Sequence, residues 1–196
     1  MTEAKVRRRV NGRSARVRRS VIESTLGLLR EGGIDQVTVA EVASRAGVHE
    51  TSIYRRWGSR ERLLIDAILD LSEANLSVPD SGSLREDLTI LATELCRYMS
   101  TPLGLAVAQL LSWPAKDPAV TEMQTEIWRD RIASAAKVVE QAIDRGEAPR
   151  NTDPRFIIEL LVAPIHWRVL VLNEQLEPDL PAKLAQAVMD GVQPPR

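Results

Sequence analysis

The stretch TVAEVASRAGVHETSIYRRWGSRERLL, residues 38–64, decides the fold that we predict for this chain. Thr38 is a good helix N-cap, and Glu41 three residues later completes the pattern of a capping box. Gly47 then supplies the left-handed residue at which the first helix must end. A second helix over residues 49–57 has inward apolar residues one turn apart. Two short helices joined by a glycine turn indicate a helix-turn-helix, whose second helix enters the major groove of DNA.

The outward face of the second helix carries hydroxyl groups, a phenol and guanidinium groups, together with one carboxylate. Such groups bind phosphate oxygens and base edges. The alternative is a solvated face on an ordinary helical hairpin, but the cap, the turn glycine and the basic face all favour DNA binding. The predicted contact residues on this face are Glu50, Thr51, Ser52, Tyr54, Arg55 and Arg56.

The same stretch resembles the DNA-binding motif of the TetR/AcrR family of bacterial transcription regulators. The resemblance rests on A-x-x-A-G-V, I-Y-x-x-W and S-R-E-x-L-L at the spacing of the family, and it covers residues 17–69. It implies that Arg60 contacts a phosphate and that Thr38 and His49 belong to the DNA-binding surface. Two positions depart from the family pattern, since His49 replaces the usual Ser or Thr cap and Glu50 places an acid near the groove.

Charge is distributed unevenly along the 196 residues, although the net charge is only −1. Residues 1–65 carry 14 Lys and Arg against 7 Asp and Glu, a net charge of +7, whereas the remaining 131 residues carry 12 against 20, a net charge of −8. This asymmetry predicts that only the N-terminal part meets a polyanion. Hydrophobic residues make up 44% of the chain and aromatic residues 4%, which suits a core of packed helices.

A basic arm over residues 5–19 precedes the motif. We expect the arm to be disordered in the free protein and to contact phosphates or the minor groove on DNA. The first helix is expected over residues 14–31. The arm's basic residues are Lys5, Arg7, Arg8, Arg9, Arg13, Arg16, Arg18 and Arg19.

The predicted fold is all-α, with about nine helices. A three-helix DNA-binding head over residues 1–58, which includes the basic arm, is joined by a connecting helix over residues 59–76 to a helical regulatory and dimerisation body over residues 77–196. SVPDSGS is the clearest linker signal in the chain. RGEAPRNTDPRFIIELLVAPIHWRVL resembles the regulatory domain of one TetR subgroup. The body helices are expected over residues 84–99, 103–111, 117–145, 154–173 and 181–190.

Catalytic and metal-binding patterns are missing from the sequence. It has no nucleophile elbow, phosphate-binding loop or metal-ligand cluster, so we expect no enzyme activity, cofactor or metal site. Cys96 is the single cysteine, which excludes an intrachain disulfide. No signal peptide or membrane span is evident, and a cytoplasmic location is expected.

The final two helices are expected to form a homodimer interface, as the resemblance implies, so that the protein reads a palindromic operator. Residues 156–172 are apolar around the whole helix, which requires cover on several sides. The alternative is a core formed entirely within one chain. The predicted interface residues are Phe156, Leu160, Leu161, Trp167, Leu184 and Val188.

The resemblance also implies a mostly apolar cavity in the body for a small apolar or amphipathic effector, whose binding releases a repressor from DNA. The alternative function is a DNA-binding dimer without an effector, controlled by a protein partner or by its expression level. Each pocket residue taken singly is also compatible with an ordinary core role. The predicted pocket residues are Cys96, Met99, Trp113, Trp128, His166 and Trp167.

Overall fold

The structure of the chain is a computed structural model that describes residues 3–72, 78–113 and 115–192. Within these ranges the chain forms nine α-helices and one short 3-10 helix, without a strand, which confirms the all-α prediction. The elements are α1 (Glu3–Gly32), η1 (Ile34–Gln36), α2 (Val39–Ala46), α3 (Glu50–Trp57), α4 (Arg60–Ser72), α5 (Leu84–Met99), α6 (Pro102–Ser112), α7 (Pro118–Arg145), α8 (Pro154–Leu170) and α9 (Leu180–Gly191).

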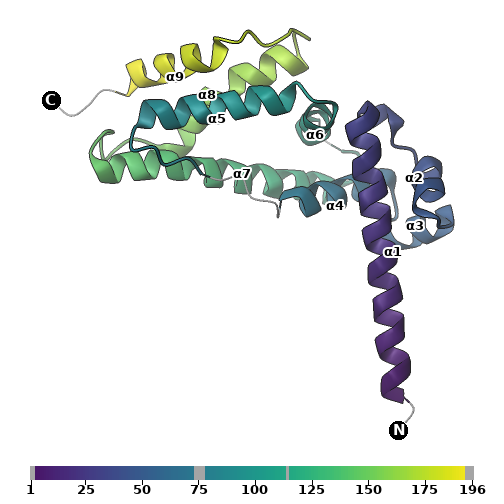
Figure 1. The fold of residues 1–196 in the computed structure, drawn as a ribbon. Coiled ribbons are helices and arrows are strands. Elements are labelled where there is room, and N and C mark those ends of the chain that lie inside the picture. Colours follow the sequence, from purple (N-terminus) through teal and green to yellow (C-terminus); the bar gives the residue numbers. More distant parts are fainter. Residues whose placement is uncertain (1–2, 73–77, 114, 193–196) are drawn as a thin grey trace.

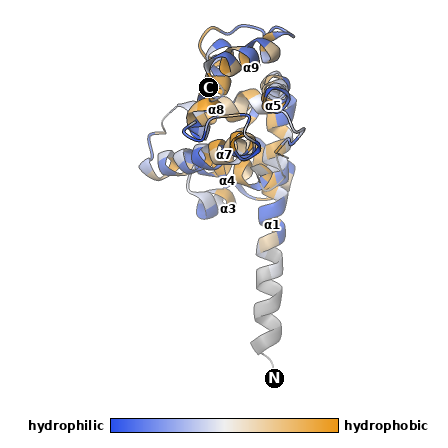
Figure 2. Ribbon diagram, turned by 90° about the vertical axis from the view of Figure 1, so that its left-hand side faces the viewer, coloured by the Kyte–Doolittle hydropathy of each residue, from blue (hydrophilic) through white to orange (hydrophobic). Residues whose placement is uncertain are grey.

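The helices form a small head at one end of an elongated body (Figure 1). In the head, α2 and α3 lie on the side of α1 that faces away from the body. In the body, α5 packs on α9, α7 packs on α8, and α6 lies between α5 and α1. The core of this bundle includes Val138 and Val139 of α7 and Ile158 and Leu161 of α8. Both helices carry hydrophobic segments, coloured orange in Figure 2. No helix in the described ranges combines the length and apolar character needed to cross a membrane.

Helix α1 is longer than the sequence predicts. It begins at Glu3, so the backbone of residues 5–19, expected to be disordered, is helical and projects beyond the head (Figure 1). That expectation was wrong, because a strongly basic segment can still form a helix when its residues favour one. The arm has no proline, and Ala, Arg and Lys are among the best helix formers.

The ends of α2 follow the predicted chemistry with one difference. The Thr38 hydroxyl accepts a hydrogen bond from the Glu41 N–H at 3.1 Å, and Gly47 ends the helix with φ 67°. The second half of the predicted capping box does not form, because the Thr38 N–H donates to the Gln36 carbonyl at 3.2 Å. The Thr38 N–H, which the Glu41 side chain would have accepted from in a capping box, is therefore bonded to the η1 turn instead.

Helix α4 is shared between the head and the body. On one side Leu63, Leu64 and Ala67 are fully buried in the head core, which also contains Ile53 and Trp57 of α3. On another side α4 packs into a second cluster, the junction core, which consists of Ile65, Ile68, Val107, Leu111, Val120 and Ile127. The connecting helix is described as far as Ser72, and its predicted end near residue 76 lies outside the described residues.

The end of α6 is closed by side chains from α7. The last carbonyl groups of a helix lack partners within the helix, so they need donors from elsewhere. The Trp128 indole N–H donates to the Leu111 carbonyl at 2.9 Å, and the buried Gln124 amide donates to the Trp113 carbonyl at 3.2 Å. This arrangement fixes α6 on α7 beside the junction core.

Candidate nucleic-acid interface

Helix α3 is held on the head by two inward residues and presents its polar side to solvent. Ile53 and Trp57 are 1% and 7% exposed, as their spacing of one turn predicts. Tyr54 is 50% exposed, and Arg55 is also exposed. His49 occupies the N-cap without a side-chain hydrogen bond, so the N-terminal N–H groups of α3 receive no cap from it. The exposed face of α3 therefore has the donors and acceptors that a DNA groove requires.

The C-terminal end of α3 is tied to α4 and α1 through one carboxylate. The Trp57 indole N–H donates to Asp66 at 2.8 Å. Arg18 of α1 donates to both oxygens of the same carboxylate, at 2.7 and 3.2 Å, and to Asp70 at 3.1 Å. These carboxylates raise the pKa of the Arg18 guanidinium. The network couples the orientation of α3 to the position of α4.

Arg56 is exposed, as predicted, and its side chain also reaches α1. Its guanidinium donates to the Ser14 hydroxyl at 3.0 Å and lies 5.5 Å from the ring centroid of Trp57. Arg56 therefore braces α3 against α1, which the outward helical face did not predict because Ser14 lies far away in the sequence.

Arg60 has partners inside the head. Its Nε donates to the Val37 carbonyl and its Nη2 to the Ile34 carbonyl, both at 2.5 Å. These bonds join the start of α4 to the η1 turn. The phosphate contact implied for Arg60 by the resemblance stays a prediction.

Helix α4 is also joined to the body by an ion pair. Arg62 of α4 contacts Asp117 at 2.7 Å, and Asp117 is the N-cap of α7, where it accepts from the Ala119 N–H at 3.0 Å. The Arg62 guanidinium and this N–H hold the pKa of the Asp117 carboxyl below its ordinary value. A movement of α7 can therefore reach α4 directly.

Comparison with known proteins matches both parts of this architecture. Residues 21–67 match the family model described as bacterial regulatory proteins, tetR family, and residues 78–188 match the tetracyclin repressor-like C-terminal domain. The chain is 36% identical over 183 residues to the HTH-type transcriptional regulator AqdR of Rhodococcus erythropolis, which covers 93% of this chain and 88% of that protein. The chain belongs to the TetR family.

Further TetR-type proteins agree with this assignment. The chain is 29% identical to the HTH-type transcriptional regulator YdeS of Bacillus subtilis over 89% of both chains. The crystal structure of the TetR family transcription regulator SCO0332 superimposes with a TM-score of 0.75 at 27% identity, covering 91% of this chain and 99% of that one. The protein is thus a DNA-binding transcription regulator of the TetR family and not an enzyme, as the sequence predicts.

Four of the six predicted pocket residues are at least partly buried in the TetR body, and two of them are in contact. Trp128 and His166 meet edge to face with 5.3 Å between ring centroids, Met99 is 3% exposed, and Cys96 is half-buried. Burial raises the pKa of the Cys96 thiol and lowers that of the His166 imidazole.

Trp113 and Trp167 do not lie in the interior, which corrects the predicted pocket. They are 62% and 56% exposed. Trp113 is the C-cap residue at which α6 ends, and Trp167 lies on the outer side of α8. A hollow of about 420 Å³ lies on the head, where α1, η1 and α2 meet.

The predicted TetR dimer residues differ in their exposure. Phe156, Leu160 and Trp167 are 54%, 46% and 56% exposed, so they form an apolar stripe on α8. Leu161 and Val188 are 0% and 6% exposed in the body core, so their assignment to an interface was wrong. A helix that is apolar on all sides does not reveal from sequence which side its own chain covers. Leu184 is half-buried and packs against the body core that contains Leu161 and Val188.

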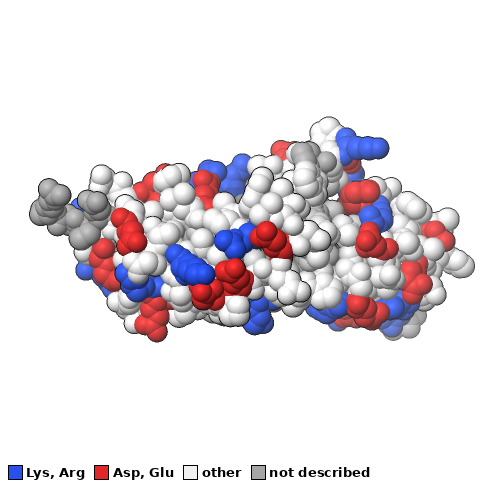
Figure 3. All heavy atoms as spheres, turned by 90° about the horizontal axis from the view of Figure 1, so that it is seen from above, with Lys and Arg blue, Asp and Glu red and all other residues white. Residues whose placement is uncertain are grey.

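The surface of the body carries charges of both signs. Seen from above, over α9 and α5, acidic and basic side chains are interspersed on the body (Figure 3). Such a mixed surface offers no field of one sign to attract a polyanion. In the described part of the chain, no cluster of His, Cys, Asp and Glu is arranged to hold a metal ion.

Proposed function

We propose that this TetR family regulator is a repressor that binds a palindromic operator as a homodimer and is released by a small effector in its body. The exposed polar face of α3, supported from beneath by Ile53 and Trp57, is the observation that carries the DNA-binding part. The proposed domains are the head over residues 1–58, the connecting helix over residues 59–76 and the body over residues 77–196.

In the proposed complex α3 lies in the major groove. Thr51 and Ser52 are near the start of α3 and are the base-proximal candidates, while Tyr54 and Arg55 contact phosphates or guanine edges. Glu50 would accept a hydrogen bond from a cytosine amino group. The remaining proposed positions either flank the groove or support α3, namely Thr38, His49, Arg56 and Arg60.

The proposed homodimer forms through the apolar stripe of α8. Five large hydrophobic residues near or on this helix are at least 46% exposed in the single chain, which is unusual for a solvent-facing surface. They are Phe156, Leu160, Trp167, Val171 and Leu172. One recognition helix covers only a few base pairs, and a two-fold axis would double the sequence that is read.

The proposed release acts through α4. An effector that favours a different spacing of the body helices would shift α4 through the junction core and the Arg62–Asp117 ion pair. The shift of α4 would then tilt α3 through the hydrogen bond between Trp57 and Asp66. The effector must bind this second arrangement more tightly, since equal affinity shifts no equilibrium. A distant TetR-like neighbour, FadR from Bacillus subtilis, was crystallised with stearoyl-CoA, so a related fold accepts a small-molecule ligand.

The proposal is tested by selecting bound duplexes from a random DNA pool and sequencing them. The expected result is an inverted repeat, and sedimentation should show one dimer on it. Selection of single half-sites bound by a monomer would contradict the homodimer. A thermal-shift screen tests the effector, because a ligand of the native state raises the melting temperature by mass action. If no small molecule in the screen raises the melting temperature, control by a protein partner or by expression level is favoured.

A further inference from the structure

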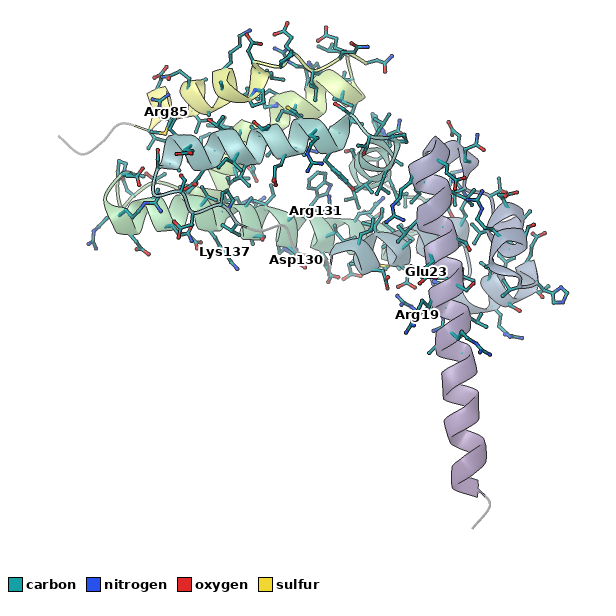
Figure 4. All side chains as sticks on the ribbon, viewed as in Figure 1. Arg19, Glu23, Arg85, Asp130, Arg131 and Lys137 are labelled. Atoms are coloured by element: carbon teal, nitrogen blue, oxygen red, sulfur yellow. The ribbon has the colours of Figure 1, made fainter. Side chains whose placement is uncertain are left out.

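Arg131 occupies an unusual place for a charged residue. It lies near the middle of α7 and points toward α5, whereas the neighbouring Asp130 lies on the opposite side of α7 (Figure 4). The side chain is half-buried, and its guanidinium contacts the hydroxyl of Tyr98 on α5. A buried cation is costly unless it is paired.

Arg131 lacks the carboxylate partner that other arginines of this chain have. Arg18, Arg45, Arg145 and Arg155 each lie within 2.7 Å of an Asp or Glu oxygen. Among the residues that the structure describes, no carboxylate forms an ion pair with Arg131, and the Tyr98 hydroxyl is the group that favours its charge. Burial accordingly lowers the pKa of Arg131 and raises that of Tyr98.

His166 of α8 is the next polar group in this region, and it is also unpaired with an acid. Its Nδ1 lies 3.0 Å from the Val162 carbonyl. Because a carbonyl only accepts, Nδ1 must carry the proton and Nε2 is the basic nitrogen of the neutral ring. The positive charge of Arg131 adds to burial in lowering the pKa of His166. The interior of the body thus contains a positive charge with no internal counter-charge from the described residues.

Apolar side chains surround these groups. Tyr98 and Trp128 pack against the junction core, while Met99 belongs to the body core, a cluster that includes Leu88, Val139, Leu161 and Ile165. Arg131 therefore interrupts what would otherwise be a continuous apolar interior. A guanidinium that is half-buried among apolar side chains, with a phenol and no carboxylate as its partner, marks a candidate binding site for an anion.

We propose that the effector of this regulator is an apolar molecule with one carboxylate, and that Arg131 and Tyr98 bind the carboxylate. This inference rests on the proposed release by an effector and names its chemical class. A guanidinium binds a carboxylate through two parallel hydrogen bonds, which is the strongest pairing available to arginine in proteins. Tyr98 accepts from Arg131 and keeps its own O–H to donate to the same carboxylate. Ile127, one turn before Arg131 on α7 and 4% exposed, offers apolar contact to the remainder of the molecule.

The position of this site explains how the ligand would act on DNA binding. Tyr98 and Trp128 pack on the junction core, which contains Ile65 and Ile68 of α4. A carboxylate that inserts between Arg131 and Tyr98 changes the spacing of α5 and α7, and α4, which packs on α7, must follow. The displacement then reaches α3 through the bond between Trp57 and Asp66.

The test uses straight-chain carboxylates from hexanoate to palmitate as probes, each paired with its neutral primary amide. For the wild type, each carboxylate is expected to raise the melting temperature and to weaken binding to the selected operator. It should do both at a concentration about tenfold lower than its amide requires, because only the acid makes a charge-assisted hydrogen bond. Arg131→Gln is expected to lose this preference. Arg129→Gln, an exposed arginine two residues away on α7, is the matched control and should keep it.

Tyr98→Phe is the second variant, in case Arg131→Gln does not fold, and it should reduce the same preference by several fold. The inference is wrong if amides act as well as acids on the wild type, or if both variants respond as the wild type does. In either case release by an effector would still stand. It is also wrong if neither series acts, and the wider thermal-shift screen then decides separately whether another effector exists.

Discussion

The indole N–H of Trp57, the last residue of α3, donates to the carboxylate of Asp66 on α4 at 2.8 Å. Arg18 of α1 holds the other oxygen of this carboxylate at 2.7 Å. One acid thus joins the three helices that determine where the DNA-reading surface lies. Since α4 also packs into the body, this contact is the point at which, in the proposed release, a change in the body reaches α3.

Removing the charge of Asp66 should loosen this joint. Asp66→Asn is expected to lower the free energy of unfolding by about 1–3 kcal/mol, because bonds to a charged group are weakened. Trp57→Phe keeps the ring but removes the donor, and its effect should overlap with that of Asp66→Asn. A double-mutant cycle in urea measures the coupling. Strictly additive losses would show that the two side chains do not act together.

Arg60 should stabilise the head through its bonds to the Val37 and Ile34 carbonyls. Arg60→Gln is expected to lower the free energy of unfolding by about 1–3 kcal/mol, because it leaves these acceptors without a charged donor. Arg129→Gln, at an exposed position of α7, is the comparison. If Arg60 instead acts only on a phosphate, thermal stability will be unchanged and the salt dependence of DNA binding will fall by about one unit.

The exposed stripe of α8 predicts which substitutions break a dimer. Leu160→Arg should give a folded monomer in sedimentation, since Leu160 is 46% exposed in the single chain. Leu161→Arg, one position further, should instead unfold the body, because that side chain is fully buried. A dimer that survives Leu160→Arg together with Trp167→Arg would place the interface elsewhere.

His166 should make the protein sensitive to mild acid. Its pKa in the folded state is depressed, chiefly by burial and further by Arg131, so the unfolded chain binds a proton first as the pH falls through the ordinary value of 6.5. Stability is therefore highest above this pH and declines below it, down to the folded-state pKa. His166→Gln should flatten the decline of melting temperature with pH, whereas His49→Gln, at an exposed position, should not. An equal decline in all three proteins would contradict this assignment.

Much of the head follows from local sequence rules. Gly47 adopts the predicted left-handed conformation, Ser59 caps α4 through the Arg62 N–H at 3.2 Å, and Ile53 is buried as its spacing requires. These features depend on neighbours within one or two turns, so a short stretch of sequence contains the information. The helix over residues 84–99 matches α5 for the same reason, with Ser83 as its cap.

The roles that the sequence did not reveal depend on distant partners. Arg56 and Ser14 are 42 residues apart, and Arg62 and Asp117 are 55 apart, so no periodicity connects them. Leu160 and Leu161 are both apolar, and only the packing of α8 decides which of them is buried. Arg131 gave no signal either, because a single arginine on a long helix is most often at the surface.

The measurement that tests the central claim most directly is the affinity of the selected operator for the wild type, Arg55→Ala and Arg129→Ala at several salt concentrations. Arg55 lies on the exposed face of α3, and Arg129 is an exposed arginine of the body. If α3 reads the operator, Arg55→Ala weakens specific binding by about 1–3 kcal/mol, and Arg129→Ala leaves it unchanged. Equal affinities for all three proteins, or a larger loss from Arg129→Ala, would contradict the assignment of α3 as the DNA-reading helix.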